Sequence, residues 1–282
     1  MTTHLPPAAA IAHSLQAKDL ALGYPDRRII DGLSVNIPSG RITAIVGPNA
    51  CGKSTLLRGL SRLLAPSGGD VLLDGRSIHS IPTRDVATVI SLLPQTPQAP
   101  DGISVADLVG RGRYPHQGWF RKWTTADDLI VDEAMVATGV RELAGRSIDE
   151  LSGGQRQRAW IAMALAQRTN ILLLDEPTTY LDITHQIDVL DLLVDVNTDA
   201  GTTVVMVLHD LNLACRYADH LIVMRDGAIV AEGAPAGVVT PELVRAVFDL
   251  DCLVLPDAVS GTPTVVPIGR HHRPAGTAQP EA

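Results

Sequence analysis

Short runs of aliphatic and β-branched residues alternate along the chain with stretches whose apolar residues recur at helical spacing. Four of these runs are apolar almost throughout, at residues 41–46, 88–93, 171–174 and 203–208. Strands of this kind are buried on both faces, as in a parallel sheet that helices cover. The pattern therefore predicts an α/β fold built around a mainly parallel sheet.

Three other parts of the chain depart from this alternation. Residues 15–37 and 70–73 have the pattern of strands separated by turn residues, which indicates a small antiparallel β-subdomain beside the core. Residues 97–150 contain few strand-like runs but two helical patterns, and the second starts at Thr124 with Asp127 three residues later. We therefore predict a helical subdomain over about 97–150, inserted between two strands of the core.

The two ends of the chain differ in composition from the rest. The first 13 residues are rich in proline and alanine, and residues 256–282 are rich in proline, glycine and histidine. Such composition is typical of loose tails that pack little apolar surface. We therefore expect a folded domain over residues 14–255, between flexible tails at 1–13 and 256–282.

The composition of the chain also limits its function. The 282 residues carry a formal net charge of −8 at pH 7, which argues against a nucleic-acid binder that works through a basic face. Three widely separated cysteines without a CxxC pair indicate reduced thiols rather than disulfides or a zinc site. The longest apolar runs are far too short to cross a bilayer, so work at a membrane would require docking to another protein.

The strongest chemical signal is a glycine-rich loop between a predicted strand and a predicted helix. Its spacing is the GxxxxGK[ST] pattern of a phosphate loop. Its residues are Gly47, Pro48, Asn49, Ala50, Cys51, Gly52, Lys53, Ser54 and Thr55. The glycines allow backbone N–H groups to turn toward phosphates, and the helix N-terminus adds positive potential. Lys53 would reach the β- and γ-phosphates, and the Ser54 hydroxyl would bind Mg²⁺.

A second signal is an apolar strand, residues 171–174, that ends in the carboxylates of Asp175 and Glu176. Alone, a strand that ends in acids proves little. Paired with a phosphate loop, it predicts that Asp175 holds Mg²⁺, directly or through water, and that Glu176 takes a proton from the attacking water.

The third signal is a segment of Ser152, Gly153, Gly154 and Gln155, which directly precedes a helical pattern at 156–167. Alone, this segment could be a helix start with Ser152 as its cap. With the other two motifs, and in this order, the chain resembles the ATP-binding subunits of ATP-binding-cassette (ABC) transporters over residues 15–247. The resemblance implies a P-loop ATPase that binds ATP and Mg²⁺. We call residues 152–155 the signature segment.

The resemblance implies roles for four further residues. Tyr24 would stack on adenine, although a tyrosine here could also pack within a turn. Gln95 would reach the metal and the attacking water, and would link the nucleotide to the transport partner. Asp182 falls in a loop that crosses between subunits. His209 would contact the γ-phosphate, although a lone histidine at a strand end is usually structural.

The same resemblance implies that one copy of the chain cannot complete its own site. ATP on the phosphate loop of one copy would be capped by the signature segment of another, whose N–H groups and serine hydroxyl donate to the γ-phosphate. The partner is then a second copy or a close relative. Ala50 and Cys51 stand where many members of the family have glycine and serine, but neither side chain is needed for phosphate contact, so full activity is expected.

Three segments indicate which group of ABC ATPases the chain resembles most. Residues 110–116, 159–164 and 175–183 look like those of ATPases that serve importers of iron chelates (siderophores), with haem and cobalamin importers as near relatives. Such a subunit would lie at the cytoplasmic face of the cell membrane, peripheral through its permease, and would act with a substrate-binding protein. The basic stretch at 111–122 would face the permease; alternatively it is a solvated loop.

Two other functions stay open at this point. The first is an importer of haem, cobalamin or a metal ion. The second is a soluble ABC ATPase that does not serve a transporter. Soluble members usually carry two ATPase domains in one chain or long insertions, and this chain has neither.

Overall fold

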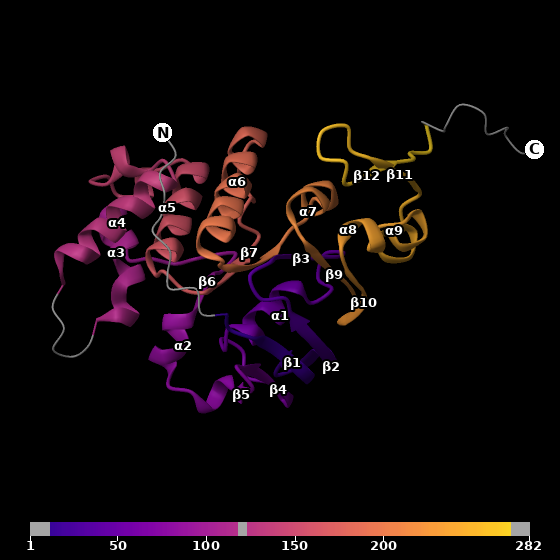
Figure 1. The fold of residues 1–282 in the computed structure, drawn as a ribbon, viewed down its shortest axis with the longest axis horizontal. Coiled ribbons are helices and arrows are strands. Elements are labelled where there is room, and N and C mark those ends of the chain that lie inside the picture. The colour runs from indigo at the N-terminus through magenta and orange to yellow at the C-terminus, as the bar shows by residue number, and fades with distance from the viewer. Residues whose placement is uncertain (1–11, 118–122, 272–282) are drawn as a thin grey trace, which may run out of the picture.

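The computed structural model describes residues 12–117 and 123–271. Its centre is a six-stranded sheet of order β10-β9-β3-β8-β7-β6, in which only the edge strand β10 runs antiparallel to its neighbour (Figure 1). The six strands are β3 (Ile42–Val46), β6 (Ile90–Leu93), β7 (Ile171–Asp175), β8 (Thr203–Val207), β9 (His220–Arg225) and β10 (Ala228–Gly233). The mainly parallel sheet of the sequence prediction is confirmed.

Every residue of β3, β7 and β8 is buried, because both faces of the sheet are covered. Side chains alternate between the faces along each strand. Ile45 and Leu173 pack on one side, in the core that includes helix α1 (Lys53–Leu60), while Leu172 and Met206 pack on the other, against α5 and α6. These strands are apolar throughout because both of their faces are buried.

A second sheet, of order β2-β1-β4-β5, is antiparallel throughout and covers α1 from outside. Its strands are β1 (Leu15–Tyr24), β2 (Arg27–Ile37), β4 (Gly68–Leu73) and β5 (Arg76–Ser77). Leu20 and Leu22 of β1 are fully buried in the same core as Leu56 and Leu57 of α1. The predicted antiparallel β-subdomain is thus present, and α1 is held between two sheets.

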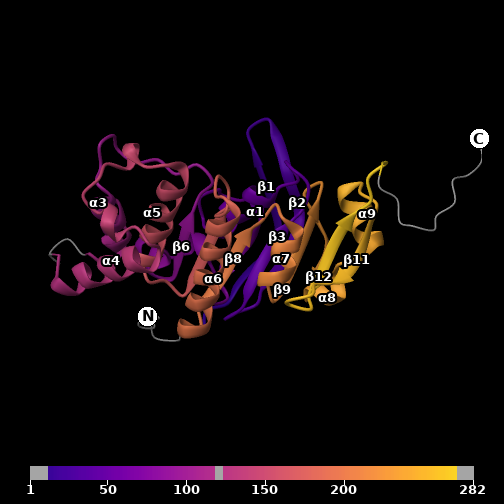
Figure 2. The same cartoon turned by 90° about the horizontal axis from the view of Figure 1, so that it is seen from above.

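Helices form the other end of the molecule (Figures 1 and 2). They are α3 (Val105–Gly110), the 3₁₀ helix η2 (Arg111–His116), α4 (Thr125–Ala137) and α5 (Gly153–Ala166). Thr124 caps α4 through the capping box with Asp127, as its spacing predicts. Because α5 packs against both α3 and α4, the helical unit extends beyond the predicted boundary at residue 150.

A buried ion pair joins three parts of this helical unit. Arg113 of η2 donates from Nε to Asp127 Oδ1 of α4 at 3.0 Å and from a terminal nitrogen to the Ala166 carbonyl oxygen of α5 at 2.8 Å. The side chains of Arg113 and Asp127 are only 8% and 7% exposed. Burial alone would raise the pKa of Asp127, but hydrogen bonds from Thr124 and Arg113 outweigh it and lower that pKa.

Replacing Arg113 by methionine should therefore destabilise the protein by about 3 kcal/mol, since the Asp127 carboxylate is left buried without its partner. The measurement is chemical denaturation of the purified protein. The matched control is Arg141→Met, because Arg141 pairs with Asp132 at an exposed site and its loss should leave stability nearly unchanged. Equal stability of Arg113→Met and the wild type would contradict this account of the pair.

The remaining elements complete the layers on the sheet. They are the helices α2 (Thr83–Val89), α6 (Ile183–Ala200), α7 (Leu211–Tyr217), α8 (Pro235–Val238) and α9 (Pro241–Phe248). The strand predicted from residue 88 begins only at Ile90, because α2 occupies the residues before it. The helix that the sequence predicts after the phosphate loop is α1, which ends at Leu60, and Arg62 has a φ of 67°.

The prediction of a loose tail from residue 256 is wrong for its first part. Strands β11 (Cys252–Pro256) and β12 (Pro263–Pro267) form an antiparallel hairpin, whose inner residues Val265 and Cys252 are buried. Asn212 of α7 fixes β12, since its side chain both donates to and accepts from the Val265 backbone. The frequent prolines suggested a tail, but Pro256, Pro263 and Pro267 stand at the ends of the two paired strands. Residues 1–11 and 272–282 lie outside the described residues.

The three cysteines are free and buried in the structure. None of the helices within residues 12–117 and 123–271 is long and apolar enough to cross a membrane.

Candidate functional site

The phosphate loop connects the end of β3 to the start of α1. Gly47 has a φ of 152°, and a Cβ added there would lie 2.1 Å from the Met224 carbonyl oxygen. Gly52 has a φ of 108° just before α1. The backbone itself therefore requires the two glycines of the motif. Ala50 also has a left-handed backbone, with a φ of 60°, which costs about 1–2 kcal/mol for a residue with a Cβ.

Lys53 is the cation of this loop and is almost fully buried, with 5% exposure. Its Nζ donates to the carbonyl oxygens of Gly47 and Pro48, each at 2.8 Å. These bonds hold the ammonium group over the loop. A phosphate that enters the loop would meet a cation that is already in place.

Ser54 and Asp175 bring a hydroxyl and a carboxylate together at the start of α1. Ser54 Oγ donates to Asp175 Oδ1 at 2.8 Å, which joins the phosphate loop to the end of β7. Burial raises the pKa of the Asp175 carboxyl above its usual value. Oxygen donors are the ligands that Mg²⁺ prefers, so these two residues fit a magnesium site.

Glu176 follows Asp175 and is also buried, with its side chain 8% exposed. Its Oε1 lies 2.7 Å from His209 Nε2, and Thr179 Oγ1 donates to its Oε2 at 3.1 Å. His209 stands after β8, which is parallel to β7, so the carboxyl ends of the two strands bring the acid and the histidine together. This is a carboxylate held by hydrogen bonds at the mouth of the loop, as a general base must be.

These residues surround a cavity of about 460 Å³, a volume suited to a small-molecule ligand. Gln95 reaches it from the loop after β6. The lining residues are Arg27, Ile29, Asn49, Ala50, Gly52, Lys53, Ser54, Thr55, Gln95, Glu176 and His209. The structure thus gathers nine of the predicted site residues around one space, although they come from four separate segments of the chain.

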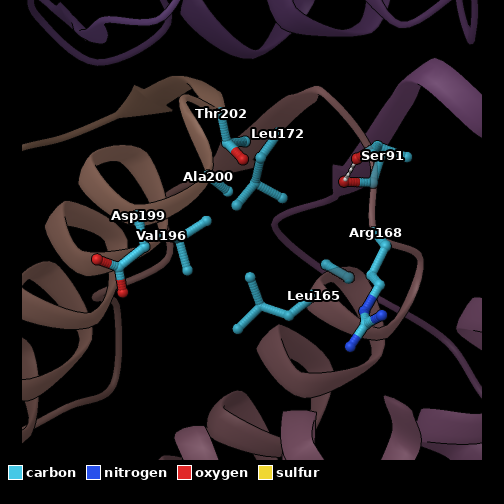
Figure 3. Close-up of a pocket in the computed structure, with 10 residues that line it drawn as sticks. Ser91, Leu165, Arg168, Leu172, Val196, Asp199, Ala200 and Thr202 are labelled. Atoms are coloured by element: carbon cyan, nitrogen blue, oxygen red, sulfur yellow. Dashed lines mark hydrogen bonds between the residues drawn. The ribbon is translucent and has the colours of Figure 1, made fainter. Parts of the chain in front are cut away.

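A second cavity lies between the ends of α5 and α6 and measures only about 40 Å³ (Figure 3). Figure 3 shows Leu165, Leu172 and Val196 between the polar side chains of Arg168 and Asp199. None of the motif residues lines it. A hollow of this size holds a few water molecules and not a nucleotide.

Comparison with known proteins decides the family. The family model described as "ABC transporter" matches residues 30–179, more than half of the chain. This chain belongs to the ABC transporter family. The P-loop ATPase fold predicted from the sequence is confirmed.

Individual relatives agree with this ABC ATPase assignment over nearly their whole length. The chain is 56% identical to the ferric enterobactin transport ATP-binding protein FepC of Escherichia coli K12, over 91% of this chain and 94% of FepC. A solved structure of a metal-chelate type ABC transporter in an inward-facing conformation superposes with a TM-score of 0.78, at 29% identity, over 92% of this chain and 99% of that chain. The dimeric cassette MJ0796 superposes with a TM-score of 0.71, at 26% identity, over 78% of this chain and 98% of that one.

The signature segment of this ABC ATPase lies at the N-terminus of α5 and does not line the cavity of its own chain. Ser152 accepts a hydrogen bond from the Gln155 N–H, and the Gln155 side chain accepts one from the Ser152 N–H. Asp182 likewise lies outside the cavity, where it caps α6 by accepting from the His185 N–H. Within one chain, these residues are capping groups, and their contact with nucleotide stays a prediction.

Tyr24 stands at the end of β1 and is 45% exposed, with its hydroxyl accepting a hydrogen bond from Arg58. It does not line the cavity, and its stacking on adenine stays a prediction. Arg27 and Ile29, on the neighbouring strand β2, do line it, and the sequence analysis missed them. The available signal was their place directly after the turn that follows Tyr24.

The basic stretch at residues 111–122 is described only in part. Its first residues form η2, in which Arg113 is buried rather than presented to a partner. Tyr114 of the same helix is 59% exposed. Residues 118–122 lie outside the described part, so a role of the whole stretch in contacting a permease stays a prediction.

Proposed function

We propose that this chain is the ATP-hydrolysing motor subunit of an ABC importer for ferric siderophores or related iron chelates. The observation that carries the chemistry is the Glu176 carboxylate, held 2.7 Å from His209 beside the cavity of the phosphate loop. The cargo is inferred from the 56% identity to the ferric enterobactin subunit over almost the full length of both chains.

In this proposal, each residue of the cavity has one task. Lys53 and the N–H groups of the loop bind the β- and γ-phosphates of ATP. Glu176 accepts the proton of the water that attacks the γ-phosphorus. His209 moves away from Glu176 to contact the γ-phosphate. Gln95 responds to whether the γ-phosphate is present in the cavity. Hydrolysis removes the contacts that depend on the γ-phosphate.

Magnesium would be held by the Ser54 hydroxyl and the Asp175 carboxylate, with Gln95 close enough to the same space to contribute an oxygen. The metal would neutralise charge on the β- and γ-phosphates. Burial raises the pKa of Asp175, and a bound dication would favour the ionised form that burial disfavours.

A second copy of the chain completes the site in this proposal. The signature segment lies outside the cavity of its own chain, and the similar cassette MJ0796 is dimeric. Tyr180, which lies close to the signature segment, and Ile183 are 81% and 80% exposed, and large exposed apolar side chains of this kind suit an interface. Two ATP molecules would join two copies, and hydrolysis would let the pair open.

The pair of motor subunits would act at the cytoplasmic face of the membrane, attached through permease subunits that receive cargo from a substrate-binding protein. Membrane fractionation tests this attachment. The chain should appear in the membrane fraction when its permease is expressed and stay in the soluble fraction when the permease is absent. Recovery in the soluble fraction in both cases would favour a soluble ABC ATPase instead.

A further inference from the structure

The carboxylate of Glu176 is restrained at both of its oxygens. Oε1 faces His209, and both of these side chains line the cavity. Oε2 accepts a hydrogen bond from Thr179 Oγ1 at 3.1 Å. Thr179 is half-buried and does not line the cavity, so it restrains Glu176 from behind.

A tight turn places the Thr179 hydroxyl at this point. Glu176 opens the turn with a left-handed backbone, at a φ of 55°, and Tyr180 closes it with a φ of 66°. The Thr179 N–H donates to the Glu176 carbonyl oxygen at 3.2 Å, so side chain and backbone of Thr179 both bind Glu176. A non-glycine residue in the left-handed region is unusual, and two of them around one turn indicate that the surrounding structure fixes its shape.

The two restraints on Glu176 differ in what happens to them during the proposed reaction. His209 must leave Oε1 if it is to contact the γ-phosphate. Among the residues that the structure describes, the hydrogen bond from Thr179 is then the remaining side-chain contact of the carboxylate. A general base acts only from a fixed position within hydrogen-bond reach of its proton, so this contact decides whether Oε1 still faces the water.

We infer that Thr179 is a positioning residue for ATP hydrolysis: its hydroxyl holds Oε2 of Glu176 so that Oε1 is presented to the attacking water. The inference rests on the proposed role of Glu176 as the general base. Thr179 touches neither nucleotide nor water in this account, so it should affect the rate of the chemical step and not the binding of ATP.

The test compares four variants of the full-length protein in steady-state ATP hydrolysis and in binding of a fluorescent ATP analogue. Thr179→Val keeps the shape of the side chain and removes the hydroxyl, and it should lower kcat about ten-fold with KM and analogue affinity unchanged. Thr179→Ser keeps the hydroxyl and should stay within about two-fold of the wild type. Thr178→Val removes a neighbouring hydroxyl that does not bind Glu176 and should match the wild type. Glu176→Gln is the fourth variant.

Three results would overturn the inference: Thr179→Val with the wild-type kcat, Thr179→Ser as slow as Thr179→Val, or a raised KM at unchanged kcat. The Glu176→Gln variant separates the proposed role of Glu176 as general base from the proposed role of Thr179 as positioning residue. If Glu176→Gln is slow while Thr179→Val is normal, the positioning role alone fails. If Glu176→Gln hydrolyses ATP at the wild-type rate, the proposed base fails, and the role of Thr179 with it. Unchanged thermal unfolding of Thr179→Val would confirm that the loss of rate does not come from a damaged fold.

Discussion

Replacing Lys53 by alanine should abolish ATP binding, with a loss of hydrolysis on the order of 100-fold or more. Lys53 Nζ is buried and fixed over the phosphate loop by two carbonyl oxygens, so the variant loses the cation that these bonds hold at the loop. In the absence of this charge, the N–H groups of the loop must hold the triphosphate without the lysine cation. Binding of a fluorescent ATP analogue and phosphate release from the purified protein measure both effects.

The matched control for this variant is Lys18→Ala. Lys18 is an exposed residue of β1 that does not line the cavity, so its loss should leave ATP binding and hydrolysis unchanged. If Lys53→Ala binds the ATP analogue as tightly as the Lys18 variant does, the loop is not the phosphate site and the account of the cavity is wrong.

Changing Glu176 to glutamine should produce a protein that binds ATP but hydrolyses it on the order of 10²–10⁴-fold more slowly. The amide keeps the size of the side chain and its place beside Thr179 and His209, but it cannot accept a proton from water. Since ATP is then retained, the proposed pair of subunits should accumulate. Phosphate release and size-exclusion chromatography in the presence of Mg²⁺ and ATP report the two outcomes.

Glu142→Gln is the control for this change, because Glu142 is an exposed acid of the helical unit. It should hydrolyse ATP normally and should not shift toward the dimer. A wild-type rate in Glu176→Gln would show that another group accepts the proton.

The sequence predicted the core of the site because its chemistry depends on local spacing. The phosphate loop follows β3, the two acids stand at the end of β7 and the histidine follows β8, and parallel strands bring their carboxyl ends to one edge. That arrangement follows from the pattern alone. The sheet, the β-subdomain and most of the helical unit were predicted for the same reason.

The parts that the sequence did not predict depend on contacts between distant segments. Arg27 and Ile29 reach the cavity because the β-subdomain folds against the phosphate loop, and their place after the turn that follows Tyr24 was the available local signal. The hairpin at the C-terminal end is stabilised by Asn212, about fifty residues earlier in the chain, which outweighs its proline-rich composition. The hydrogen bond of Thr179 depends on left-handed backbone at Glu176, which no propensity predicts for glutamate.

The central claim is that this chain drives the import of iron chelates by hydrolysing ATP. The most direct measurement is the uptake of labelled ferric siderophores, with haem and cobalamin as controls, in cells that carry or lack this gene. We expect siderophore uptake to be lost without the gene, to return with the wild-type gene and to remain absent with Glu176→Gln, while uptake of haem and cobalamin is unchanged. Unchanged siderophore uptake in cells that lack the gene would contradict the claim.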